Sequence, residues 1–196
     1  MSTPDRIAAH FAELAQLSTA VASQYTRQIS DLASLVSRAL ADDHKLMFCG
    51  NGGSAADAQH LATEYVVRFG RSRAPLAAIA LTTDTSLLTA ASNDFGFEQV
   101  FARQVLALGR PGDLLFLHST SGKSPNLLRA AEAARSTGVV SIALLAADGG
   151  PLAGLVDHAL VIPTDNGAHA QELHLAIGHV ICGLVEANLP LPSTAP

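Results

Sequence analysis

Residues 46–54 read Leu-Met-Phe-Cys-Gly-Asn-Gly-Gly-Ser (LMFCGNGGS), a short apolar run followed at once by a glycine-rich turn. Similar apolar runs occur at 77–81, 114–117, 139–145 and 159–162, each followed by turn-forming residues. Short runs that are apolar throughout are typical of parallel strands buried on both faces. Helix-length segments separate the runs. The sequence therefore predicts right-handed βαβ units and an α/β fold with a doubly wound parallel sheet.

Helices are expected on both sides of this region. Residues 4–43 carry apolar side chains at helical spacing and predict two helices, and residues 167–188 predict one more. The first two contain no chemically distinctive residues, so we expect residues 1–43 to pack on the core and in an oligomer. Residues 44–189 then form the main part of what is a single domain overall. The Pro-rich end, 190–196, is expected to be a flexible tail.

The composition limits the classes of function. Of 196 residues 48% are hydrophobic and 15% charged, which suits one domain and favours subunit interfaces. A net charge of −5 and the lack of Trp argue against nucleic acid and against an anionic membrane surface as partners. Two cysteines give no disulfide framework, and no apolar run approaches the roughly 18 residues of a membrane span. We expect a cytoplasmic protein.

Ligands of doubly wound sheets bind beyond the carboxyl ends of the strands, which here are the loops after the apolar runs. In the loop 50–54, glycines permit a sharp turn and a close approach of the backbone to a ligand. We expect Ser54 to cap the following helix, with Asp57 completing a capping box, so that the helix favours a phosphate or a sugar. Two alternatives remain open: a plain turn, and a dinucleotide site on the G-x-G-x-x-A pattern of Gly50, Gly52 and Ala55.

The loop 118–124, HSTSGKS, offers hydroxyl groups and one glycine before a helix that is expected to start near Ser124. Hydroxyls and backbone N–H groups of this kind can hold a phosphate. The end of this loop, GKS, could suggest a nucleoside-triphosphate loop, but Leu117 stands where such a loop requires its first glycine. We therefore reject a nucleoside-triphosphate site. A Ser/Thr-rich turn without a ligand is the remaining alternative.

Polar residues also occur at helical spacing. His60 and Glu64 are four residues apart and share a helix face, where an imidazole and a carboxylate suit a divalent metal or simply a solvated surface. Gln171 and His179 lie two turns apart on an otherwise apolar helix. A histidine there is either a hydrogen-bonded core residue or part of a site, and burying several polar groups without partners would be costly.

Four segments together resemble the phosphoheptose isomerase branch of the sugar isomerase (SIS) domain family. They are GNGGSAADAQHLATEYVVRF, LTTDTSLLTAASNDFGFEQVFARQVLALGRPGD, STSGKSPN and QELHLAIGH, at 50–69, 81–113, 119–126 and 171–179. The resemblance implies a three-layer α/β/α sandwich with a five-stranded, flavodoxin-like parallel sheet, a homotetramer, and sites shared between subunits. It also implies an isomerase that interconverts sedoheptulose 7-phosphate, a phosphorylated seven-carbon sugar, and D-glycero-D-manno-heptose 7-phosphate.

The resemblance also implies roles for individual residues. Glu64 matches the general base of the family and His179 its general acid. The zinc ligands seen in some members match His60, Glu64, Gln171 and His179. Positions that match substrate contacts are Asn51, Gly52, Gly53, Ser54, Arg68, Asn93, Asp94, Ser119, Thr120, Ser121, Ser124 and Gln171.

The chain departs from the family in two places. Lys123 replaces the usual Asn of S-G-N-S, and the segment 167–172, GAHAQE, replaces T-A-R-I-Q-E. These departures bear on the exact substrate more than on the reaction type. Alternative functions are a non-catalytic SIS protein that binds a protein partner such as a replication initiator, a sugar-phosphate sensor, and a nicotinamide-dependent enzyme.

Overall fold

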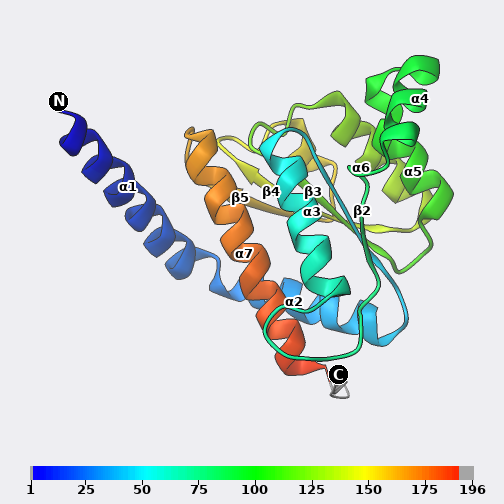
Figure 1. Cartoon of the computed structure of the whole chain (residues 1–196), viewed down its shortest axis with the longest axis horizontal. Coiled ribbons are helices and arrows are strands. Elements are labelled where there is room, and N and C mark those ends of the chain that lie inside the picture. Colours follow the sequence, from blue (N-terminus) through cyan, green and yellow to red (C-terminus); the bar gives the residue numbers. More distant parts are fainter. Residues whose placement is uncertain (1, 190–196) are drawn as a thin grey trace.

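A parallel five-stranded sheet forms the centre of the structure, a computed structural model that describes residues 2–189 (Figure 1). Its strands are β1 (Leu46–Gly50), β2 (Ala78–Ala80), β3 (Leu114–Ser119), β4 (Val140–Ala146) and β5 (His158–Ile162). The order is β2-β1-β3-β4-β5, the flavodoxin-like order, and every pairing is parallel. The predicted fold class is thus confirmed, and each apolar run overlaps one strand.

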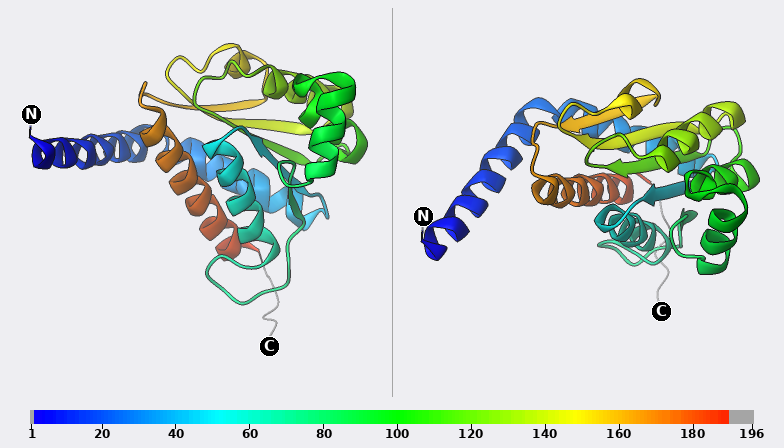
Figure 2. Two further views of the ribbon diagram at one scale, coloured as in Figure 1. Left: turned by 45° about the horizontal axis from the view of Figure 1, so that its top comes forward. Right: turned by 90° about the horizontal axis from the view of Figure 1, so that it is seen from above.

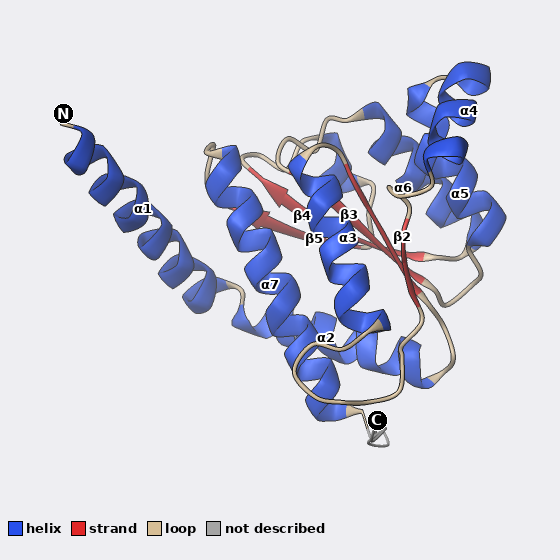
Figure 3. Ribbon diagram, in the orientation of Figure 1, coloured by secondary structure: helices blue, strands red, loops and turns tan. Residues whose placement is uncertain are grey.

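Helices cover both faces of the sheet, which makes the three-layer sandwich (Figures 2 and 3). Their bounds are α1 (Thr3–Gln24), α2 (Thr26–Ala41), α3 (Gly53–Val66), α4 (Thr85–Phe95), α5 (Val100–Leu108), α6 (Pro125–Thr137) and α7 (Gly167–Asn188), with short 3-10 turns η1 (Phe97–Gln99) and η2 (Pro151–Gly154). Helices α2, α3 and α7 pack on one face, and α4, α5 and α6 pack on the other. Both helices predicted over 4–43, and the one over 167–188, are present.

Helix α1 projects away from the sandwich (Figure 1). Val21, near its end, is its one buried residue, whereas Ile7 and Phe11 are exposed. The corner after α1 is fixed to the sheet, because the Tyr25 hydroxyl donates a hydrogen bond to the carbonyl of Val161 at 2.7 Å.

The register of β1 and β3 brings their carboxyl ends to one level. Phe48 pairs with Phe116, and their rings stack with centroids 5.0 Å apart. Gly50 pairs with His118, so the loops that follow the two strands start side by side. His118 was expected in the hydroxyl loop, but it lies within β3 and is fully buried, because the strand continues to Ser119.

No helix within residues 2–189 is both long enough and apolar enough to cross a membrane. The expected flexible tail, 190–196, lies outside the described residues.

Candidate functional site

Three side chains from α3 and α7 meet on the face of the sandwich that these helices cover. The His60 Nε2 atom lies 3.1 Å from Glu64 Oε1, one helical turn away on α3. It also lies 2.9 Å from Nε2 of His179 on α7. The carboxylate and the imidazole predicted to act together are therefore neighbours, although they are far apart in the sequence.

Close packing of α3 on α7 produces this contact. Gly178 precedes His179, and a Cβ atom at this position would lie 2.5 Å from Leu61 Cδ2. Leu61 follows His60 and is buried. The absence of a side chain at Gly178 thus lets α7 approach the part of α3 that carries the site.

The cluster has the donor set of a cation site. Two ring nitrogens that face each other at 2.9 Å need a proton or a cation between them, since two lone pairs repel. Atoms bonded to one tetrahedral zinc at about 2.0–2.1 Å lie roughly 3.3 Å apart, close to the separations seen here. His60, Glu64 and His179 therefore fit a zinc ion. His60 is 45% exposed at its side chain and Glu64 20%, so the cluster is open to solvent.

Phe69 completes one side of the cluster, and its role was not predicted from the sequence. Its ring stacks on the His179 imidazole with centroids 5.4 Å apart. Phe69 lies in the loop after α3, and buried Glu186 of α7 holds this loop by accepting hydrogen bonds from the N–H groups of Phe69, Gly70 and Arg71, each at 3.0 Å. An acidic residue near the end of an apolar helix was the available signal.

The predicted capping of α3 by Ser54 is wrong. The N-cap is Gly52, which has a positive φ of 58° that favours glycine, and no side chain caps the helix. Ser54 instead lies inside the first turn and is buried. Because no side-chain hydrogen bond caps the helix, the predicted capping box with Asp57 is absent as well.

The glycine loop contacts both α7 and α6. A Cβ atom on Gly53 would lie 2.6 Å from Gln171 Oε1, so the Gln171 amide rests directly against the loop backbone. Asn51 and Asn126 exchange two amide hydrogen bonds, of 2.9 and 2.8 Å. Asn126 lies within the STSGKSPN segment, but its pairing with Asn51 depends on the strand register and was not foreseen.

The hydroxyl loop lies at the carboxyl end of β3. Ser119 Oγ accepts a hydrogen bond from the N–H of Gly122 at 3.0 Å, and Ser121 Oγ accepts one from Lys123 at 3.3 Å. Ser124 is the N-cap of α6, as expected from the sequence, and its hydroxyl makes no capping bond. Thr120 lies beside the first residue of α7, since a Cβ atom on Gly167 would lie 3.9 Å from the Thr120 hydroxyl oxygen. The loop therefore keeps hydroxyl groups next to a helix N-terminus, where an anion is favoured.

Three predicted contact residues are not part of this cluster within one chain. Asn93 and Asp94 lie on α4, in the opposite helical layer, where the Asn93 amide donates a hydrogen bond to Asp94. Arg68 is exposed in the loop after α3.

The two thiols lie in the protein interior. Cys49 and Cys182 are free and buried. Burial raises the pKa of Cys182 to about 12, more than the hydrogen bond with Tyr65 lowers it. Both thiols are unsuited to nucleophilic catalysis in this state, because the thiolate is the reactive form.

Comparisons with known proteins identify the family of the chain. The SIS domain family model matches residues 9–146. The chain is 52% identical over 161 residues to the phosphoheptose isomerase of Rhodospirillum rubrum, covering 82% of this chain and 86% of the relative. It is also similar to two solved structures of phosphoheptose isomerases. That from Neisseria gonorrhoeae has a TM-score of 0.90 and 42% identity, over 95% of this chain and all of the other. That from Francisella tularensis has a TM-score of 0.93 and 37% identity, over 96% of this chain and all of the other.

Proposed function

Because the chain belongs to the SIS domain family, in its phosphoheptose isomerase branch, we propose that it interconverts sedoheptulose 7-phosphate and D-glycero-D-manno-heptose 7-phosphate. The chain is a sugar-phosphate isomerase. The observation that carries the proposal for its chemistry is the meeting of Glu64 and His179 around His60, at separations of 3.1 and 2.9 Å.

Ketose–aldose exchange moves a hydrogen between C1 and C2 of the sugar through an enediol. In the proposed mechanism, the Glu64 carboxylate takes the proton from one carbon and returns it to the other. His179 moves the hydroxyl protons, and Phe69 keeps its ring in place by stacking on it. Each positioned acid or base typically contributes about 10² to 10⁴ in rate.

Phosphate binding supplies the orientation of the substrate. We assign it to Ser54 and to the hydroxyls of Ser119, Thr120, Ser121 and Ser124, with Asn51, Gly52, Gly53 and Gln171 lining the sugar. The glycine loop and the hydroxyl loop lie at adjacent strand ends, which supports a single ligand spanning both. Binding energy from the distant phosphate then positions the reacting end.

We propose that His60, Glu64, Gln171 and His179 hold one Zn²⁺ per subunit at this site. The ion would polarise the substrate carbonyl or stabilise its enediolate. Three of these residues already converge, and the Gln171 amide lies on the same helix as His179, against the glycine loop. Metal analysis of the purified protein, repeated for His60→Gln, tests this assignment.

We further propose a cytoplasmic homotetramer. An apolar groove of about 480 Å³ runs between α1, α2 and α7, lined mainly by Val21, Ile29, Leu173, Ile177, Val180 and Leu184. With the exposed Ile7 and Phe11 of α1, it offers a surface for a second copy. An assembly also gives Arg68, Asn93 and Asp94 a way to reach a neighbouring site. The free thiols Cys49 and Cys182 suit a reducing compartment. Light scattering after gel filtration measures the oligomeric state.

The test of the activity is turnover of sedoheptulose 7-phosphate followed by NMR. Glu64→Gln and His179→Gln are each expected to lower kcat by about 10² or more. Exposed Glu132→Gln and His158→Gln are the matched controls and should keep full activity. Folded wild-type protein without turnover would contradict the isomerase assignment. Full activity of both site variants would contradict the assigned roles.

A further inference from the structure

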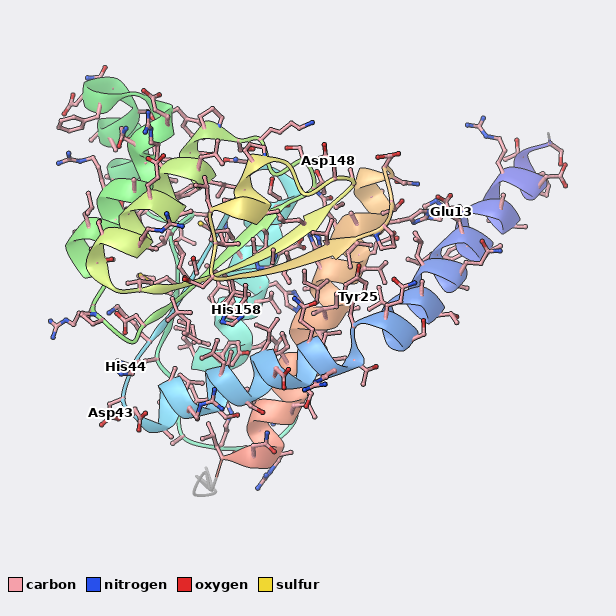
Figure 4. All side chains as sticks on the ribbon, turned by 180° about the vertical axis from the view of Figure 1, so that it is seen from behind. Glu13, Tyr25, Asp43, His44, Asp148 and His158 are labelled. Carbon is pink, nitrogen blue, oxygen red and sulfur yellow. The ribbon has the colours of Figure 1, made fainter. Side chains whose placement is uncertain are left out.

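A second group of histidines and carboxylates joins α1 to the first turn of α7. It consists of His10 and Glu13 on α1 and His169 and Glu172 on α7, and we call it the α1–α7 cluster. Glu13 lies beside the start of α7 (Figure 4). The rings of His10 and His169 are in contact, with centroids 4.2 Å apart. The mechanism proposed above uses none of these residues.

His169 is the buried centre of the cluster, with no exposed side-chain surface. Its Nδ1 atom lies 3.0 Å from Glu172 Oε2, and this hydrogen bond requires a proton on Nδ1. In the neutral ring the proton on Nδ1 leaves a lone pair on Nε2. Nε2 is buried without a hydrogen-bond partner and faces Glu13 Oε2 at 3.4 Å. A lone pair and a carboxylate oxygen thus face each other, an arrangement that a proton or a metal ion between them would stabilise.

His10, His169 and Glu172 each offer one ligand atom, and these atoms all lie within 4.8 Å of one another. Ligand atoms on a tetrahedral zinc lie roughly 3.3 Å apart, and the Nε2–Oε2 separation of His169 and Glu13 is 3.4 Å. His10 Nε2 lies 3.9 Å from Glu172 Oε1, a gap that rotation of two partly exposed side chains can close. A carboxylate that holds the far nitrogen of a ligating histidine, as Glu172 does here, is the usual support of such a ligand.

We propose that the α1–α7 cluster binds a divalent transition-metal ion, zinc by chemistry, which fastens α1 to α7. His10, His169 and Glu172 supply ligand atoms that all lie within 4.8 Å of one another, and Glu13 can add an oxygen beside Nε2 of His169. Glu172 also orients His169 through its other oxygen. Two imidazoles with carboxylates are a ligand set for zinc and its neighbours in the first transition series rather than for Mg²⁺ or Ca²⁺. A metal ion shared by α1 and α7 would fix the position of α1, which projects from the α/β/α sandwich and is exposed along most of its length.

The test is calorimetric titration of ZnCl₂ into metal-free full-length protein. The parent is the double variant His60→Gln/His179→Gln, which lacks two ligands of the first site. We expect this parent to bind one zinc per chain. Adding His10→Gln should raise the Kd roughly 100-fold or more, since even the loss of an outer-shell partner costs 10- to 100-fold. Adding His158→Gln instead, an exposed histidine on β5, should change nothing (Figure 4).

Hydrogen exchange supplies a readout that does not depend on affinity. Zinc should slow exchange of the α1 amides in the parent, and EDTA should reverse the effect. His10 is only partly buried, so His10→Gln should fold, which far-UV circular dichroism checks. A parent that binds no zinc, or a His10→Gln variant that binds it as tightly as the parent, would overturn the proposal. Neither outcome depends on isomerase activity.

Discussion

Glu186→Gln is predicted to destabilise the protein strongly, although it exchanges only one oxygen of the side chain for an amino group. Glu186 is 4% exposed and accepts hydrogen bonds from three backbone N–H groups of the loop after α3. It also accepts one from Arg73 Nε at 2.8 Å. Arg73, itself buried, donates to the carbonyls of Glu64 and Tyr65, so the pair connects the end of α3, the loop and α7.

The magnitude follows from these contacts. Each hydrogen bond to a charged group contributes about 1.5–3 kcal/mol, and a glutamine oxygen can keep only some of the four. The glutamine amide also points N–H donors at other donors and leaves Arg73 a buried charge without its counter-ion. Removing one partner of a buried pair costs about 3–5 kcal/mol, which agrees with the loss of two such bonds. For a chain of this size, 1 kcal/mol shifts Tm by about 2–4 °C, so the expected fall is about 6–20 °C.

Calorimetry or thermal circular dichroism at pH 7 measures this fall. Glu132→Gln is the matched control, because Glu132 pairs with Arg129 on the surface of α6 and should leave Tm almost unchanged. A Glu186→Gln variant with the Tm of the control would refute the reasoning, since it would mean that the four donors find other partners at no cost.

The effect should also depend on pH in a defined direction. Burial raises the pKa of Glu186, but the hydrogen bonds from Phe69, Gly70, Arg71 and Arg73 together bring it below its ordinary 4.5. A carboxylate with a lowered folded-state pKa stabilises the fold above its unfolded pKa and loses this contribution as the pH falls through the folded value. The difference in stability between wild type and Glu186→Gln should be complete at pH 7 and shrink below about pH 4.

Two more predictions concern the core near the site. Gly178→Ala places a Cβ about 2.5 Å from Leu61 Cδ2, so overpacking should lower the free energy of unfolding by about 1–3 kcal/mol. The same shift should move His179 and reduce kcat. A variant with unchanged stability and unchanged kcat would contradict the packing argument. Burial, and to a lesser extent the charge of His174, lowers the pKa of His118 to about 3, so the folded state keeps His118 neutral while the unfolded chain protonates it near pH 6.5. Stability should therefore be lost as the pH falls from about 6.5 towards 3. The free energy of unfolding of His118→Leu, measured with urea, should depend less on pH over that range than that of the wild type. An equal pH dependence in the two proteins would refute the prediction.

The fold was predictable from the sequence because the signals for it are local. A strand buried on both faces must be apolar throughout, so 46–50 or 140–146 can be recognised without knowing its neighbours. The bounds of α7 follow in the same way from its apolar spacing between a polar loop and the proline-rich end. Local signals also mislead: Ser54 and Asp57 fit a capping box, but the tight turn after β1 puts Gly52 at the N-cap.

The sequence by itself determined which residues are candidates for the chemistry, since an imidazole, a carboxylate and a hydroxyl-rich loop are recognisable by type and position. Only the tertiary structure decided which of them meet. His60 and His179 are 119 residues apart, and their contact depends on how closely α3 and α7 pack at Gly178. Side-chain packing likewise decides that Glu186 accepts a hydrogen bond from the loop that carries Phe69. It also decides that His169 is hydrogen-bonded to Glu172 and faces Glu13. Such contacts are set by distances of a few ångströms between elements, which the spacing of residues along a chain does not encode.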